Sequence, residues 1–155
     1  GDRYRNVIGI FMNQLMQSKP LTVFGDGEQS RAFSCIHDVA PYIADSVNTK
    51  DAYNQVINIG GDIDYTVNEL AKTVMNVMGL YSKINYLEAR NEVSHAYADH
   101  NKAYNIFGID ADKLTSLENG LVEMADWVKK AGIRKTPKFE NIEIMDNLPT
   151  VWLND

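Results

Sequence analysis

The sequence has a single cysteine, no long hydrophobic run and few basic residues. One cysteine, Cys35, excludes an internal disulfide and a cysteine-rich zinc site, and it suits a reducing compartment. The longest strongly apolar stretch, residues 7–12, is far too short to span a bilayer, and the first residues do not have the layout of a signal peptide. Lys and Arg number 15 against 21 Asp and Glu, a net charge of −6, which disfavours the basic patch of a nucleic-acid surface. We therefore expect a cytoplasmic domain without membrane or nucleic-acid partners.

What is present is an ordinary globular composition, with 155 residues of which 45% are apolar, enough for one domain with its own core. Apolar residues at helical spacing alternate with short β-prone runs, which predicts an α/β fold. The expected helices cover residues 8–19, 38–48, 66–78, 99–107 and 115–128, and the expected strands cover residues 21–24, 31–36, 56–59 and 83–87. The pattern ends at Gly132, so we expect a domain over residues 1–132 and a C-terminal extension, residues 133–155, packed on it.

Polar residues mark where several of these helices begin. Thr66 and Thr115 are each followed three residues later by Glu, the spacing of a capping box. Asp38 and Asp99 are predicted to cap the two shorter helices.

The glycines Gly25 and Gly27 come close to the dinucleotide-binding fingerprint G-x-G-x-x-G, with Ser30 in the place of the third glycine. That fingerprint opens a helix, so that the helix N-terminus meets the pyrophosphate. Here a strand comes next, and the segment is therefore predicted to be a hairpin turn.

Two groups of residues suggest other chemistry without completing it. His95, Asp99 and His100 lack the further convergent ligand that a metal site needs, so no metal site is predicted. Cys35 and His37 would share a strand face, but no third group is seen to orient them, which favours a buried structural thiol.

Arg31 is more informative, because Phe33 lies two residues on and so on the same strand face. A guanidinium beside an aromatic ring suits phosphate recognition with an adjacent stacking surface. Arg90 comes shortly after the strand predicted at residues 83–87. These patterns alone indicate an α/β domain that can bind an anion.

The order of the segments adds a resemblance. Residues 21–40 read LTVFGDGEQSRAFSCIHDVA and resemble the segment L-x-[IV]-[FY]-G-D-G-x-Q-x-R-D-[FY]-[VI]-x-[VI]-x-D-[VL]-A of the nucleotide-sugar epimerases and dehydratases in the extended short-chain dehydrogenase/reductase family. Residues 56–60, 66–70, 90–92, 99–103 and 115–121 are similar to that family's later motifs, in the same order. The match runs from Asn6 to about Gly132.

The resemblance covers only the C-terminal, substrate-binding part of such enzymes. It implies a small α/β substrate-binding domain, short strands with flanking helices, from which the Rossmann domain is absent. None of the eight tyrosines is followed by Lys four residues later, so the Tyr-x-x-x-Lys pair is missing. We therefore expect no catalytic residue and no bound cofactor in this chain, and NAD in the full-length parent.

Residue by residue, the family match implies a UDP- or dTDP-sugar site. Arg31 and Arg90 would bind the diphosphate, and Glu92 the ribose hydroxyls. The residues expected near the base and at the entry to the first helix are Thr22, Phe24, Phe33, Asn6 and Val7. The chain departs from the family at Ala32 and His37, which replace Asp, and in the Arg90 loop, which is one residue short.

The resemblance also bears on the surface of the domain and on its independence. The face bearing Thr22, Phe24, Arg31 and Phe33 is expected to be exposed and to favour self-association, since its natural neighbour would be the Rossmann domain. The alternative to an enzyme portion is a free-standing binding or interaction module derived from the same domain.

Overall fold

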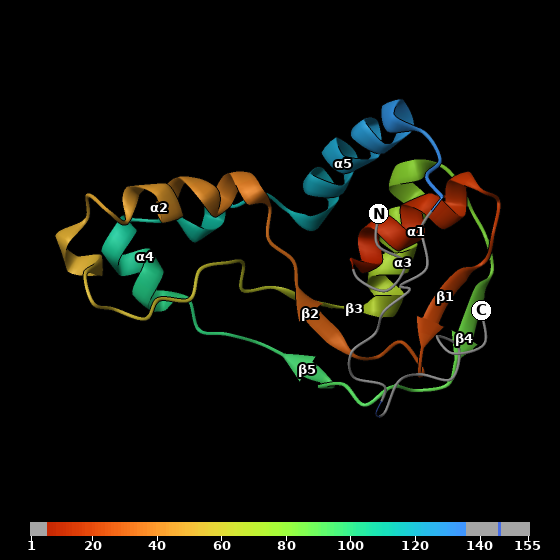
Figure 1. Cartoon of the computed structure of the whole chain (residues 1–155), viewed down its shortest axis with the longest axis horizontal. Coiled ribbons are helices and arrows are strands. Elements are labelled where there is room, and N and C mark those ends of the chain that lie inside the picture. The colour runs from red at the N-terminus through yellow and green to blue at the C-terminus, as the bar shows by residue number, and fades with distance from the viewer. Residues whose placement is uncertain (1–5, 136–145, 147–155) are drawn as a thin grey trace.

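Five helices and two small sheets make up the described part of the chain, residues 6–135 and 146, in this computed structural model (Figure 1). The helices are α1 (Val7–Met16), α2 (Ala40–Asp45), α3 (Val67–Met78), α4 (Asn101–Phe107) and α5 (Leu117–Ala131). The strands are β1 (Leu21–Phe24), β2 (Ser30–Ala32), β3 (Asp64–Thr66), β4 (Ile84–Leu87) and β5 (His95–Ala96). The predicted α/β class is confirmed. No helix within the described residues is long and apolar enough to cross a membrane.

The strands pair across long sequence distances. β1 lies parallel to β4, with Phe24 opposite Leu87. In the second sheet β2 is central, antiparallel to β3 and parallel to β5, with Arg31 opposite Ala96. Because parallel strands end at the same sheet edge, the segments that come after β1 and β4 are brought together.

The core lies where α1, α3 and α5 pack together with β1, at the right of Figure 1. Its largest fully buried side chains are Phe11, Met12, Leu21, Leu70, Leu121, Val23 and Val74. Burying one such side chain stabilises a fold by about 1.5–3 kcal/mol. The predicted helical stripes in α1, α3 and α5 therefore supply the core, as expected.

A second packed unit, formed by α2 and α4, lies at the opposite end of the molecule (Figure 1). The rings of Tyr42 and Phe107 are 5.9 Å apart between centroids. Ala103 and Ile109 are buried there, and Lys102 Nζ donates to the Val56 carbonyl at 3.0 Å. This end has a much smaller buried cluster than the α1–α3–α5 core.

Two strand predictions are wrong. The Gly25–Gly27 segment is a turn, but it does not make a hairpin, because β1 pairs with β4 while β2 pairs with β3 and β5. Residues 56–59 are not a strand: no described strand pairs with them, and Val56 is 87% exposed. The strand predicted at residues 31–36 is shorter than expected, since β2 ends at Ala32 and Ile36–Asp38 form a 3-10 turn.

The helix caps agree in part. Thr66 and Glu69 form the predicted capping box of α3. The cap of α5 is Ser116, not Thr115, and its side chain accepts from the Asn119 N–H. Asp38 does not cap α2; instead it accepts hydrogen bonds from Thr115.

Two further predictions concern the start of α4 and the segment beyond α5. The N-cap of α4 is His100, without a side-chain cap hydrogen bond, so the cap predicted at Asp99 is wrong; Asp99 instead accepts from the N–H of Asn101 in the turn that leads into the helix. The predicted C-terminal extension lies largely outside the described residues.

Candidate functional site

The parallel pairing of β1 with β4 brings Phe24 and Arg90 into contact. Phe24 is the last residue of β1 and lies opposite Leu87 in β4. Arg90 comes three residues after Leu87. The Arg90 guanidinium carbon lies 4.0 Å from the centroid of the Phe24 ring, a cation–π contact. This contact fixes the arginine over the end of the first sheet. It also means that Arg90 covers one face of the ring that the sequence placed near a base.

Arg31 reaches the same place from the second sheet. In the register of β2 with β5, Arg31 lies opposite Ala96, and its side chain extends back towards Ser94 and Glu92. Its Nη1 donates to the carbonyls of Ser30, at 2.6 Å, and Ser94, at 3.3 Å. Its Nη2 lies 3.4 Å from Glu92 Oε2, and Arg90 Nη2 lies 3.5 Å from the same oxygen. The structure thus brings together the three charged residues that the sequence assigned to nucleotide binding.

Gln29 is a residue that the sequence analysis missed. Its side-chain amide donates to the Phe24 carbonyl at 2.9 Å and to Glu92 Oε1 at 3.3 Å. It therefore ties the glutamate to the end of β1. The signal was present in the sequence, since Gln29 matches a fixed position of the Gly-Asp-Gly-x-Gln segment.

The other predicted site residues are less directly connected to this cluster. Thr22 is held by Gln14, whose amide donates to the Thr22 hydroxyl at 2.9 Å and accepts from its N–H at 3.2 Å. Phe33 packs against the core, as does Val7 at the start of α1. Asn6 caps α1 by accepting from the Gly9 N–H at 3.2 Å.

The face that was expected to be exposed is half-buried. Thr22, Phe24, Arg31 and Phe33 each have intermediate exposure, because Gln14, Arg90, Glu92 and the core respectively cover part of them. The arginine cluster itself remains open to solvent, with 30% of the Arg31 side chain and 27% of the Arg90 side chain exposed.

The histidines and aspartates considered for metal binding have separate partners. His95 Nδ1 lies 2.9 Å from the Ser30 hydroxyl, Asp99 accepts from the Asn101 N–H, and His100 Nδ1 lies 2.7 Å from Asp62. Near the last pair, burial and the neighbouring carboxylate of Asp62 raise the pKa of Tyr104 to about 12. These contacts fix loops within the fold.

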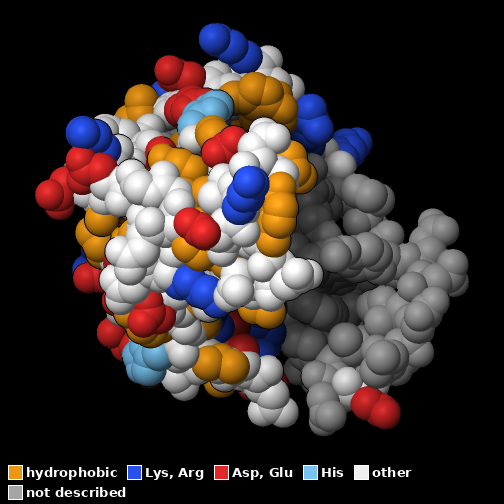
Figure 2. Space-filling model, turned by 90° about the vertical axis from the view of Figure 1, so that its left-hand side faces the viewer, with side chains coloured by type: hydrophobic (Ala, Val, Ile, Leu, Met, Phe, Trp, Pro, Cys, Tyr) orange, Lys and Arg blue, Asp and Glu red, His pale blue; other side chains and the backbone are white. Residues whose placement is uncertain are grey.

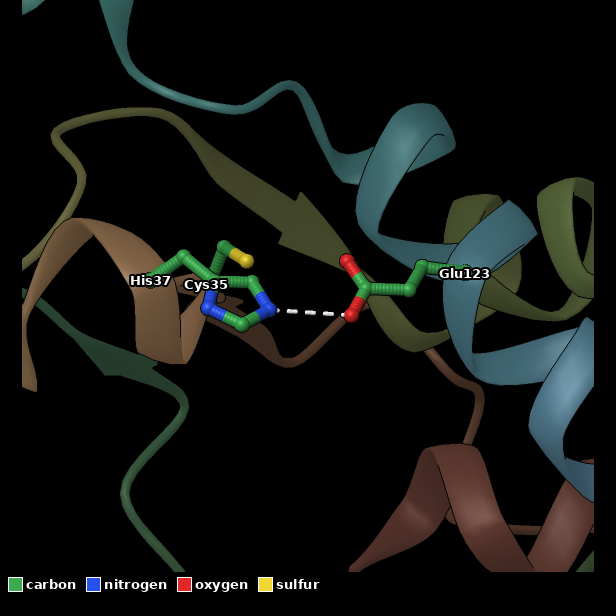
Figure 3. Close-up of side chains that lie close together, drawn as sticks. All are labelled: Cys35, His37 and Glu123. Carbon is green, nitrogen blue, oxygen red and sulfur yellow. Dashed lines mark hydrogen bonds and ion pairs between the residues drawn. The ribbon is translucent and has the colours of Figure 1, made fainter.

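Cys35 is not the buried strand thiol that the sequence predicted. It lies in an extended segment just before the 3-10 turn Ile36–Asp38 and is half-buried. His37 does have a third group beside it, since its Nε2 lies 2.9 Å from Glu123 Oε1 on α5 (Figure 3). The hydrogen bond and charge of Glu123 raise the pKa of His37 above its usual value of 6.5.

The arrangement of Arg31, Arg90 and Glu92 can bind an anion. Two guanidinium groups approach one carboxylate oxygen from different sheets. An oxygen of a phosphate or diphosphate has similar charge and hydrogen-bonding capacity, and it would form charge-assisted bonds with both groups. Glu92 thus occupies the position at which such an anion would bind, and it must move for the anion to do so.

Several curated proteins are similar to this chain over most of its length. An uncharacterized UDP-glucose epimerase of Bacillus subtilis is 32% identical over 111 residues, which are 71% of this chain and 34% of that protein. A putative UDP-glucose 4-epimerase of Methanocaldococcus jannaschii is 31% identical over 79% of this chain and 39% of its own length. A UDP-glucuronate 4-epimerase of Thermodesulfobacterium geofontis is 28% identical over 89% of this chain and 39% of its own length. This chain therefore spans well under half of the relatives it matches.

Solved structures are likewise similar to this chain over most of its length and over less than half of their own. The UDP-glucuronic acid 4-epimerase of Bacillus cereus, in complex with UDP-glucuronic acid and NAD, has a TM-score of 0.75 and 29% identity, over 85% of this chain and 43% of that one. The UDP-glucose 4-epimerase of Thermotoga maritima with UDP-glucose has a TM-score of 0.72 and 28% identity, over 84% of this chain and 42% of that one. No protein-family model matches the chain.

Proposed function

Because this chain is homologous to a part of the UDP-sugar epimerases and decarboxylases, which are extended short-chain dehydrogenase/reductases, we propose that it binds the diphosphate of a nucleotide-sugar. It is the substrate-binding portion of such an enzyme and has no catalytic residue of its own. Its proposed location is the cytoplasm.

The observation that carries this proposal is the convergence of Arg31 and Arg90 on one carboxylate oxygen, at 3.4 and 3.5 Å. Arginine forms planar, paired hydrogen bonds that match phosphate geometry. Both guanidiniums are partly exposed, so a diphosphate can reach them from solvent. Their fixation by Phe24 and by the Ser30 and Ser94 carbonyls reduces the side-chain entropy that binding would cost.

In this proposal Glu92 moves from the arginines to the ribose hydroxyls when a nucleotide binds. Phe33, Thr22 and Phe24 lie near the base, and Asn6 and Val7 contribute from the entry to α1. The ligand is a UDP- or dTDP-sugar.

The activity proposed for a full-length parent resembles that of UDP-glucose 4-epimerase. NAD would be held there by a Rossmann domain, which also brings the Tyr-x-x-x-Lys pair. Crystal structures of the Bacillus cereus relative contain NAD. The residues of this chain would hold the nucleotide while the sugar faces the cofactor.

The affinity of this chain for a nucleotide is expected to be weak. Charge-assisted bonds contribute about 1.5–3 kcal/mol each, and association costs at least about 4 kcal/mol in lost freedom. The expected dissociation constant is on the order of millimolar, which corresponds to about −4 kcal/mol. UDP and UDP-glucose should bind almost equally, because the diphosphate supplies most of the interaction.

A titration of UDP and UDP-glucose against the labelled chain tests the proposal. Arg31→Ala should abolish binding, and Arg31→Lys should weaken it, because lysine keeps the charge but cannot form paired bonds. Arg134→Ala removes the same side chain just beyond the end of α5 and should leave binding unchanged. Equal binding by the chain and by Arg31→Ala would contradict the proposal.

A further inference from the structure

Three side chains of different chemistry come together between α5 and the segment that contains the Ile36–Asp38 turn. The Cys35 thiol, the His37 imidazole and the Glu123 carboxylate each offer an atom, and these atoms lie within 4.8 Å of one another (Figure 3). His37 Nε2 and Glu123 Oε1 are 2.9 Å apart. Among the described residues, this is the one group of three or more His, Cys, Asp or Glu side chains that lie close enough together to hold a metal ion.

The fold holds the two segments in place. Asp38, the last residue of the 3-10 turn, accepts from the Thr115 N–H at 2.7 Å and from the Thr115 hydroxyl at 3.1 Å. Thr115 directly precedes Ser116, the cap of α5. Glu123 lies about two helical turns beyond that cap, so it is on the same side of α5 as the anchored turn. The turn and the helix thus present their side chains to each other.

Thiolate, imidazole and carboxylate are the three ligand types that proteins use for zinc. Ligand atoms about 2.0–2.3 Å from a tetrahedral zinc ion lie about 3.3–3.8 Å from one another. The distance from His37 Nε2 to Glu123 Oε1 is slightly shorter than this, and the two side chains are 67% and 64% exposed. The three ligand atoms lie within 4.8 Å of one another, so binding would need side-chain rotations, which the exposure of His37 and Glu123 permits.

We propose that Cys35, His37 and Glu123 bind one Zn²⁺ ion, with a fourth position left for water or a ligand atom. All three residues line a cavity of about 360 Å³, whose other walls are largely apolar side chains of α1 and α5, among them Ile8, Leu121, Met124 and Trp127. A site with three protein ligands and one open position is the arrangement of zinc ions that bind or activate small molecules. Of the residues assigned to the nucleotide, Phe33 alone lines this cavity, so the zinc site is separate from the arginine cluster.

Cobalt(II) is the probe for the test, because it occupies zinc sites and reports their geometry by its absorption. The chain is freed of metal with a chelator and titrated with Co²⁺, and the cobalt is then displaced with Zn²⁺. The variants are Cys35→Ser, His37→Gln and Glu123→Gln. The matched controls are Asp126→Asn, which removes a carboxylate one turn further along α5, and His95→Gln, which removes a histidine outside the cluster.

One equivalent of Co²⁺ should give a tetrahedral spectrum with a thiolate charge-transfer band, and Zn²⁺ should abolish it. Cys35→Ser should lose the band, and His37→Gln and Glu123→Gln should weaken Co²⁺ binding at least about tenfold. Both controls should bind as the parent chain does. The proposal is overturned if no tetrahedral spectrum forms, or if His37→Gln and Glu123→Gln retain it unchanged, which would indicate cysteine alone. Circular dichroism of each variant verifies folding, which these positions outside the core should leave intact.

Discussion

At the scale of single residues, Glu92 determines the state of the arginine cluster. Its Oε2 contacts both Arg31 and Arg90, and its Oε1 accepts from Gln29. The cluster is therefore already neutralised in part by an internal anion. An external phosphate must compete with a carboxylate that is tethered to the same protein.

Glu92→Gln should tighten the binding of inorganic pyrophosphate, which has no ribose for Glu92 to contact. Removing an exposed competing charge is worth up to about 1 kcal/mol, or about fivefold. Glu118→Gln makes the same change on α5 and should have no such effect. Titration calorimetry or phosphorus NMR measures the difference. Weaker pyrophosphate binding in Glu92→Gln would show that the carboxylate orients the arginines instead of competing with the ligand.

At the scale of elements, local signals predicted local structure. The helical spacing and capping box of α3 placed it to the residue, because Thr66, Glu69 and the apolar stripe lie within one continuous segment. Strand pairing could not be predicted in this way, since β1 finds its partner beyond α3 and not across the Gly25–Gly27 turn. For the same reason the sequence did not predict that Glu123 contacts His37, because the two residues are 86 positions apart.

The family resemblance identified more of the site than the spacing did. Arg31, Arg90 and Glu92 were assigned by their motif positions, and the structure brings these three together. Gln29 belongs to the same motif but was not chosen, because its role depends on a carbonyl and a carboxylate from other segments. The nucleotide roles of all the assigned residues remain predictions.

Thr66→Ala should destabilise the fold by about 1 kcal/mol, because the Thr66 hydroxyl accepts from the Glu69 N–H at the start of α3. Thr73→Ala is the matched control, since the Thr73 hydroxyl bonds only within the helix, to the Glu69 carbonyl. Thr73→Ala should change the free energy of unfolding by only a few tenths of a kcal/mol. Urea denaturation measures both. Equal losses would show that the cap contributes nothing specific.

At the scale of the whole molecule, exposed large hydrophobic side chains are spread over the surface, and several of them lie at the end formed by α2 and α4. Figure 2 views the end formed by α2 and α4, where hydrophobic side chains lie among charged ones. Val47 is 70% exposed and Val56 is 87% exposed. The self-association predicted for the face around Phe24 and Arg31 stays a prediction; because that face is half-buried, this end is a second candidate for the contact.

We expect concentration-dependent self-association that Val56→Lys reduces, because a charge placed in an apolar contact must be desolvated. Val122→Lys, on the exposed side of α5, is the control and should leave association unchanged. Sedimentation velocity over a range of concentrations measures both variants. Association that is retained in Val56→Lys would rule out this end as the contact, and a monomer at every concentration would contradict the prediction itself.

The central claim is that Arg31 and Arg90 together bind a nucleotide diphosphate, and the side-chain Nε–Hε resonances of these two arginines test it most directly. In a ¹⁵N-labelled chain titrated with UDP, both resonances should shift along one saturable curve on the order of millimolar. Uridine, which lacks phosphate, should shift neither, and Arg31→Ala should remove the response at Arg90. Unmoved arginine resonances at saturating UDP, or shifts at Arg90 that persist in Arg31→Ala, would contradict the account.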